Sequence, residues 1–142
     1  MDRTTPSSDL ARVMDAHLAL IGTDIERWLT LFADDAVVEF PYAPSLGMPS
    51  RLEGIEAIRA YFVPITQRFQ GLAFAGVQRY PTTDPNVGWM EVHGSATLQP
   101  SHFHYEQDYV MRLHLREGRI VRYREYWNPL AAPAGTFGKE QA

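Results

Sequence analysis

The chain has 142 residues, of which 45% are hydrophobic and 12% aromatic, and its formal net charge is −4. This length and composition suit one globular domain with a buried core and exclude a disordered or fibrous chain. The lack of cysteine excludes thiol catalysis, thiolate metal sites and disulfides, and the acidic balance argues against nucleic acid as a partner.

Two further features concern the location of the protein and the extent of the domain. No apolar stretch approaches the length that spans a bilayer, so we expect no membrane partner. Residues 1–8 lack the apolar core of a secretory signal, which predicts a cytoplasmic protein. We expect a single domain over residues 8–130, with tails at residues 1–7 and 131–142.

The start of the sequence predicts two helices in a tight hairpin. The first begins after Ser7 or Ser8, which can cap its amides, and ends at Gly22 in a left-handed conformation. The second begins with a capping box that starts at Thr23. His17 lies on the apolar stripe of the first helix, where we expect a packed histidine without a functional role.

A strand, a loop and a third helix are expected next. Residues 36–40 are β-rich and end at Pro41, and residues 42–50 contain the proline and glycine typical of a loop. Pro64 is expected to kink or end the third helix. The apolar stripe of that helix is formed by Ile55, Ile58, Phe62, Ile65 and Phe69.

From residue 72 onward the apolar pattern changes to period two. Strands are expected at residues 72–80, 87–98, 104–116 and 119–127, joined as an antiparallel meander. Helices followed by such a meander indicate an α+β domain. A strongly bent sheet with helices in its concavity would enclose a pocket for a small molecule.

Alternation gives the strand over residues 104–116 two unlike faces. One face carries Tyr105, Gln107, Tyr109, Met111, Leu113 and Leu115. The other face carries His104, Glu106, Asp108, Val110, Arg112 and His114. Two arrangements are open. In one, the apolar face builds the core and the charged face meets water. In the other, the polar face lines a pocket and the apolar face is buried in a homodimer.

Several motifs resemble a known superfamily. Residues 31–40 (LFADDAVVEF) and 52–58 (LEGIEAI) resemble the nuclear-transport-factor-like superfamily, which includes ketosteroid isomerases and SnoaL-like polyketide cyclases. Phenazine-biosynthesis A/B proteins are similar in the second half, at residues 83–86 (TDPN), 89–91 (WME) and 124–129 (REYWNP). The resemblance implies a cone-shaped α+β barrel, in which a strongly curved antiparallel or mixed sheet and three helices of the N-terminal half enclose a pocket.

The resemblance also implies which face is functional. In that superfamily the third helix and the concave sheet face line the pocket, and the convex face commonly builds a dimer, which favours the arrangement with polar residues inward. The acid/base glutamate of the phenazine proteins falls on Glu125, and their partner histidine falls on Tyr61. The general base, the first-helix tyrosine and the second acid of the ketosteroid isomerases fall on Phe40, Ala16 and Val110. These catalytic groups of the isomerases are therefore absent from the sequence.

Glu125 is the leading catalytic candidate. The flanking Tyr123 and Trp127 would remove water from its carboxyl and raise its pKa, as suits a proton shuttle near neutral pH. The alternative is a structural ion pair with Arg112 or Arg122.

Three further catalytic candidates are Asp108, His93 and Tyr61. Asp108 and Glu106 share the expected inner face, where one carboxyl would hold a proton; the alternative is a solvated strand face. His93 is expected to carry a proton or bind the ligand rather than a metal, and Tyr61 to orient the substrate. The expected substrate-binding residues are Trp28, Phe40, Tyr42, Phe62, Trp89, Glu91, Glu106, Arg112, Tyr123 and Trp127.

Together these features predict a cofactor-independent enzyme that isomerises, cyclises or condenses a hydrophobic cyclic or polyketide-like molecule by moving protons. No glycine-rich phosphate loop is present, so we expect no cofactor, and we expect no metal. The expected partners are a small hydrophobic ligand and a second copy of the chain, bound through the convex sheet face. A binding protein of the same fold without chemistry, or a small interaction module, is the alternative.

Overall fold

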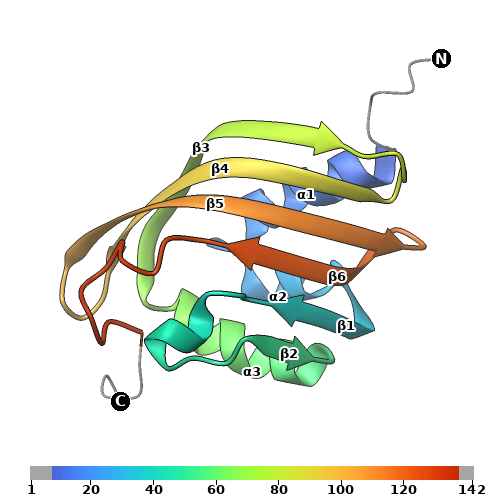
Figure 1. Cartoon of the computed structure of the whole chain (residues 1–142). Helices are drawn as coiled ribbons and strands as arrows, with labels where there is room; N and C mark the ends of the chain where they lie inside the picture. Colours follow the sequence, from blue (N-terminus) through green and yellow to red (C-terminus); the bar gives the residue numbers. More distant parts are fainter. Residues whose placement is uncertain (1–7, 138–142) are drawn as a thin grey trace.

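A computed structural model describes residues 8–137 (Figure 1). Its helices are α1 (Ser8–Leu20), α2 (Ile25–Leu29), α3 (Ile55–Thr66) and the short 3-10 helix η1 (Ala43–Leu46). Its strands are β1 (Phe32–Glu39), β2 (Arg51–Glu53), β3 (Phe69–Pro81), β4 (Val87–Leu98), β5 (Phe103–Arg116) and β6 (Arg119–Tyr126). The predicted tail at residues 1–7 and the last part of the other, residues 138–142, lie outside the described range.

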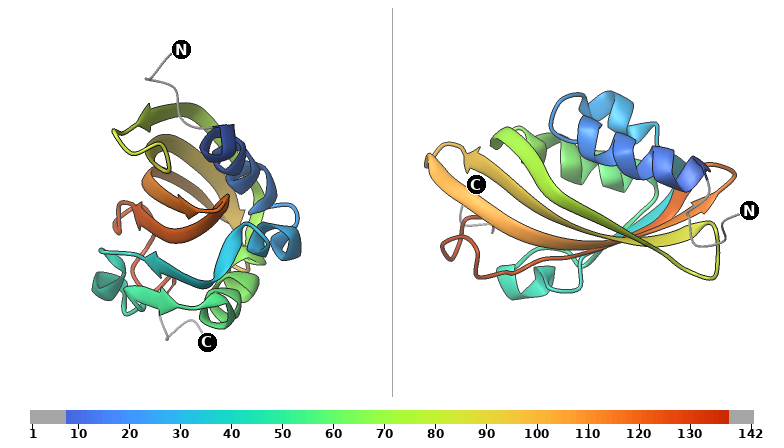
Figure 2. Two further views of the ribbon diagram at one scale, coloured as in Figure 1. Left: turned by 90° about the vertical axis from the view of Figure 1, so that its right-hand side faces the viewer. Right: turned by 90° about the horizontal axis from the view of Figure 1, so that it is seen from above.

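The six strands form one mixed sheet in the order β2-β1-β6-β5-β4-β3. Strands β3 to β6 build the predicted antiparallel meander, and β1 joins β6 in parallel. The sheet is strongly curved and open, with β2 and β3 at its edges, and the helices lie on its concave side (Figure 2). The expected α+β class with a mixed sheet and three helices is confirmed.

The segment before β3 contains more regular structure than the sequence predicts. Strand β1 starts at Phe32, ahead of the predicted residues 36–40, and the expected loop contains η1 and β2. Helix α3 continues past Pro64 to Thr66. None of the described helices is both long and apolar enough to cross a membrane.

The helix hairpin differs in detail from the prediction. Asp24, not Thr23, caps α2, because its carboxylate accepts a hydrogen bond from the Arg27 amide at 3.1 Å. Gly22 does not adopt the predicted left-handed conformation. Instead, a Cβ at Gly22 would lie 3.1 Å from the Cβ of Leu72, so the glycine permits the hairpin to approach β3 closely.

The inner face of β5 is the apolar one. The buried residues of this strand are Tyr105, Gln107, Met111, Leu113 and Leu115. On the other face, the Asp108 side chain is 90% exposed. The inward-polar arrangement that the resemblance favoured is therefore wrong for β4 and β5, and the arrangement with an apolar core is correct. The physical reason is that charged side chains lose hydration on burial, which an apolar interior does not replace.

Strand β6 nevertheless carries one acidic residue to the inner face. Its pairing with β5 shifts register near the connecting turn, and beyond that shift Tyr123 pairs with Leu113 and Glu125 with Met111. Directly opposed residues of antiparallel strands lie on the same face of the sheet. Tyr123 and Glu125 therefore point toward the helices.

Candidate active site

A cavity lies between α3, the inner face of the sheet and the segment that follows β6. The empty space between its walls, counted together with the open solvent at its mouth, is about 770 Å³. Its walls are mainly apolar, and Glu125 is the single charged residue among the wall residues that the structure describes. The large side chains of the wall include Phe40, Tyr61, Phe62, Phe74, Tyr105, Tyr109, Met111 and Trp127.

Glu125 is the titratable acid of this cavity. Burial disfavours the charged carboxylate and raises the pKa of Glu125 from 4.5 to about 7. Hydrogen bonds from Trp127 and from Tyr123, whose hydroxyl lies 2.6 Å from Oε1, act in the opposite direction. Both protonation states are therefore populated near neutral pH, so the carboxyl can take up or release a proton.

Behind Tyr123, buried polar groups continue into the helix hairpin. Trp28 Nε1 donates a hydrogen bond to His17 Nδ1 at 2.9 Å, and His17 Nε2 lies 3.2 Å from the Tyr123 hydroxyl oxygen. Complete burial lowers the pKa of His17 to about 4, so the imidazole is neutral at physiological pH. His17 is packed, as predicted, but it also connects α1 to the hydrogen-bond partner of Glu125.

Helix α3 places Tyr61 on another wall of the cavity. Its ring packs against Phe40 and Phe62, with ring centroids 5.2 Å and 5.1 Å away. Burial and the nearby charge of Glu125 raise the pKa of Tyr61 above its usual range. The phenol is therefore protonated at neutral pH and can donate a hydrogen bond to a ligand.

The segment after β6 closes one side of the cavity. Gln107 on the inner face of β5 holds this segment, because it donates to the Asn128 carbonyl and accepts from the Asn128 amide, both at 2.9 Å. Farther along, Phe137 stacks on Phe69 with ring centroids 5.9 Å apart. Ala132 and Phe137, which fall in the predicted tail at residues 131–142, therefore contribute to the cavity wall.

A family model described as a SnoaL-like domain matches residues 11–123. The chain belongs to the SnoaL-like domain family. This SnoaL-like chain is 38% identical over 119 residues to an uncharacterized PhzA/B-like protein of Pseudomonas aeruginosa, covering 84% of the chain and 83% of that protein. It is 27% identical over 120 residues to phenazine biosynthesis protein PhzA1 of the same species, covering 82% and 74%. The resemblance predicted from the sequence motifs is confirmed.

Solved structures share the fold of the SnoaL-like chain. A crystal structure from Bacillus subtilis superposes with a TM-score of 0.81 at 32% identity, covering 92% of each chain. A Mycobacterium tuberculosis protein in complex with estradiol-17beta-hemisuccinate has a TM-score of 0.73 at 22% identity, covering 88% and 98%. A ketosteroid isomerase from Mycobacterium sp. has a TM-score of 0.72 at 22% identity, covering 87% and 96%. The last two likenesses concern the fold alone.

Three acid/base candidates of the SnoaL-like chain lie outside the cavity, on the outer face of the sheet. His93 Nδ1 lies 2.8 Å from an Asp108 carboxylate oxygen, and His93 Nε2 contacts Glu106. Hydrogen bonds with Asp108 and Glu106 raise the pKa of His93. The predicted place of these residues inside the pocket is wrong, and the alternative of a solvated strand face is correct. Within residues 8–137, no three acidic or histidine side chains are grouped to hold a metal ion.

Several predicted binding residues also lie away from the cavity. Trp89 stacks on Tyr126 with ring centroids 6.3 Å apart, and the Arg112 guanidinium lies 5.8 Å from the Trp89 ring. Glu91 accepts a hydrogen bond at 3.1 Å from a tyrosine of β3, and Tyr42 is 51% exposed. Their predicted place in the pocket is wrong, because the face of the sheet that carries them is the outer one. Tyr42 lies outside for another reason, since it follows β1 and packs on Tyr126.

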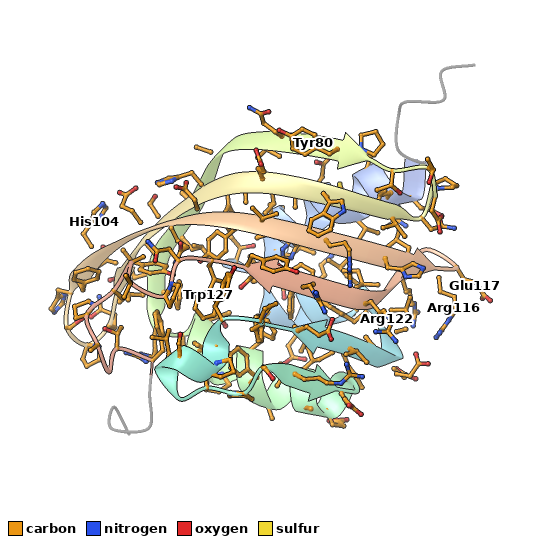
Figure 3. The ribbon with its side chains drawn as sticks, viewed as in Figure 1. Tyr80, His104, Arg116, Glu117, Arg122 and Trp127 are labelled. Carbon is orange, nitrogen blue, oxygen red and sulfur yellow. The ribbon has the colours of Figure 1, made fainter. Side chains whose placement is uncertain are left out.

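The remaining predicted residues lie in or next to the cavity. Phe40, Phe62 and Trp127 line it, and Figure 3 shows Trp127 at the start of the segment that follows β6. Trp28 and Tyr123 are buried in the core behind the wall. A role of these side chains in ligand binding stays a prediction.

The ion pair that is the alternative for Glu125 does not form. Arg112 Nη2 lies 4.0 Å from the Glu39 carboxylate, and Arg122 is exposed. Among the salt bridges of the described residues, none includes Glu125. The carboxyl is stabilised by hydrogen bonds instead.

Sequence reasoning misses part of the cavity wall. It assigns the face of Tyr105, Tyr109 and Met111 to a dimer interface. The structure places these residues in the cavity wall, so the prediction of a dimer interface on this face is wrong. The signal that could have found them is the length of the apolar alternation on β5, which is typical of a core. For His17, the signal is its place on the buried stripe of α1.

Proposed function

We propose that this chain is a cofactor-independent acid/base enzyme that isomerises, cyclises or condenses a hydrophobic cyclic or polyketide-like small molecule. The observation that carries the proposal is the Glu125 carboxyl inside an apolar cavity, with a pKa of about 7. General acid–base catalysis is most efficient when the pKa of the catalytic group lies near the working pH.

Tyr61 supplies the second group of the proposed mechanism. Its hydroxyl donates a hydrogen bond to a carbonyl oxygen of the substrate, which stabilises the enolate that forms when Glu125 removes a proton from the adjacent carbon. In a β,γ-unsaturated ketone this enolate is conjugated with the carbon–carbon double bond, and the carboxyl returns the proton to the γ carbon. The double bond moves, and no atom, electron or cofactor is consumed.

The walls of the cavity support a ring-containing substrate. Phe40, Phe62 and Trp127 offer flat apolar surfaces, on which a cyclic molecule buries much of its area. The Mycobacterium tuberculosis protein of the same fold was crystallised with an estradiol derivative, which supports a cyclic ligand here.

Identification of a bound compound and one isosteric variant test the proposal. Mass spectrometry of molecules that co-purify with the native chain names the ligand class, and related compounds are then assayed for conversion. Glu125→Gln preserves shape and should reduce turnover by about 100-fold or more while binding persists. Glu117→Gln, at the exposed β5–β6 turn, is the matched control and should behave as wild type. Unchanged turnover in Glu125→Gln would remove this residue from the mechanism.

A non-catalytic ligand-binding protein of the same fold is the second candidate. It is favoured by Phe40, an apolar residue at the position of the isomerase base, and by Tyr61, which cannot accept a proton at neutral pH. Under this alternative, the co-purified compound is recovered intact after prolonged incubation with the wild-type chain. Conversion that requires Glu125 would contradict it.

We also propose that the chain forms a homodimer through the outer face of the sheet, where Tyr80 and Val110 are exposed. Light scattering should then give a mass twice that of the monomer. Val110→Glu should lower the measured mass to that of one chain. A monomeric wild type would contradict the proposal. The cytoplasmic location is retained as a prediction that cell fractionation tests.

A further inference from the structure

The hydrogen bonds behind Glu125 have a defined direction. The indole N–H of Trp28 can only donate, and Trp28 Nε1 lies 2.9 Å from His17 Nδ1. Nδ1 is therefore the accepting nitrogen of a neutral imidazole. The single ring proton of His17 lies on Nε2, since each neutral imidazole carries one N–H.

The proton on Nε2 determines the orientation of the next group. His17 Nε2 lies 3.2 Å from the Tyr123 hydroxyl oxygen, which accepts this hydrogen bond. The Tyr123 hydroxyl then directs its own hydrogen to Glu125 Oε1, 2.6 Å away. A hydrogen bond of this length to a carboxylate is strong, and each donor in such a chain polarises the next.

We propose that His17 is a positioning residue for Glu125. His17 acts through the Tyr123 hydroxyl, and Trp28 holds the tautomer of the imidazole. The inference rests on the proposed function, in which Glu125 is the acid/base group, and adds the residues that set its proton affinity. With its proton on Nδ1 instead, His17 would accept from Tyr123, and the carboxylate would lose the Tyr123 donor and keep only that of Trp127.

The other groups near the carboxyl do not supply this orientation. The titratable side chains that face it from α3, β5 and β6 are Tyr61, Tyr105, Tyr109 and Tyr123. Burial raises the pKa of each phenol, so all four are neutral near pH 7. His17 is enclosed by the uncharged rings of Trp28 and Tyr123, which leaves its hydrogen bonds to fix its proton.

A pH titration of the Glu125 side-chain carboxyl by ¹³C NMR tests the proposal without any substrate. The wild-type titration should have its midpoint at about pH 7. Tyr123→Phe removes one of the two donors, leaving Trp127, and should raise the midpoint by about one pH unit. His17→Leu should raise it as well. The double variant should have the same titration midpoint as Tyr123→Phe alone, because His17 acts only through the Tyr123 hydroxyl.

Two matched variants separate positioning from packing. His17→Gln retains one acceptor and one donor and should return the midpoint toward the wild-type value. Met14→Leu changes a buried neighbour on α1 and should leave the midpoint unchanged. The proposal is overturned by an unchanged midpoint in His17→Leu, by an equal change in Met14→Leu, or by additive effects in the double variant.

A measurement on the wild-type imidazole covers the case in which His17→Leu does not fold. ¹⁵N NMR should show Nε2 protonated and Nδ1 bare from about pH 5.5 to about pH 8, because the pKa of His17 is lowered to about 4. A proton on Nδ1 in this range would overturn the proposal. These readouts are independent of turnover, so inactivity of Glu125 in catalysis and failure of the positioning role are distinguishable results.

Discussion

Glu125 and His17 lose most of their contact with water on folding, with opposite effects on their pKa values. Burial raises the pKa of Glu125 to about 7 and lowers the pKa of His17 to about 4. In both residues the neutral form is the one that folding favours. The contribution of His17 to stability is present above pH 6.5, its unfolded pKa, and is lost as the pH falls through about 4.

The free energy of unfolding should also depend on Glu125 at higher pH. Because folding raises its pKa, the contribution of this residue is complete below pH 4.5 and is lost as the pH rises through about 7. We expect the wild type to lose on the order of 3 kcal/mol by this route. Glu125→Gln cannot ionise and should not show this loss. Urea unfolding at several pH values measures it, and an identical pH dependence in both proteins would contradict burial of the charge.

The environment of Glu125 was predictable from the sequence, and that of Asp108 was not. Tyr123 and Trp127 lie two positions before and after Glu125, so they share its face of β6 whichever way that face points. For Asp108, the side that meets the helices had to be known. Period-two alternation separates the two faces of β5, and its long apolar face favours the core. The resemblance favoured the polar face inside, so the two signals disagreed.

Among the elements, β4 shows how a missing side chain shapes the cavity. A Cβ at Gly94 would lie 2.9 Å from Cε2 of Tyr109 and 3.3 Å from Cε1 of Phe74. Carbon atoms in contact normally lie about 3.5–4.0 Å apart. Both rings line the cavity, so the glycine leaves the space that they occupy.

Gly94→Ala should therefore affect both stability and binding. The added methyl group must displace the ring of Tyr109, and overpacking of this kind destabilises a core by about 1–3 kcal/mol. The displaced ring should also weaken binding of an aromatic probe in the cavity. Ser95→Ala, the adjacent residue on the outer face, is the control and should leave both unchanged. Urea unfolding and probe fluorescence measure the two effects, and a variant as stable as wild type would contradict the close contact.

The long strands were predictable because they carry a period, and the short elements were not. The observed bounds of β3 to β6 differ from the predicted ones by a few residues at most. Strand β2 has only three residues, Arg51–Glu53, too few for alternation to be recognised. The start of β1 contains Asp34 and Asp35, which are poor strand formers, and it is held by pairing with distant residues of β6.

In the molecule as a whole, the cavity combines elements that are far apart in the chain. Helix α3, strands β3 and β5, the end of β6 and residues from the segment 128–137 contribute to its wall. The sequence predicts the fold class and a pocket between helices and sheet. It does not predict the part of the wall formed by Ala132 and Phe137, because a short segment rich in alanine, proline and glycine has no periodicity.

The residues that line the whole cavity predict how the charge of a ligand affects its binding. No lysine, arginine or histidine is present among the wall residues that the structure describes, and Glu125 is acidic. An anionic ligand would lose its hydration and face a like charge without a cationic partner.

An uncharged ring ketone should therefore bind more tightly than a carboxylate of the same size. At pH 8, where Glu125 is mostly ionised, 2-acetylnaphthalene should bind at least about ten-fold more tightly than 2-naphthoate. Calorimetric titration of both probes measures the ratio. In Glu125→Gln the ratio should decrease, because the repulsion is removed and only the desolvation of the ligand remains. Equal binding of the two probes by the wild type would mean that a cation reaches the cavity, which contradicts an uncompensated Glu125.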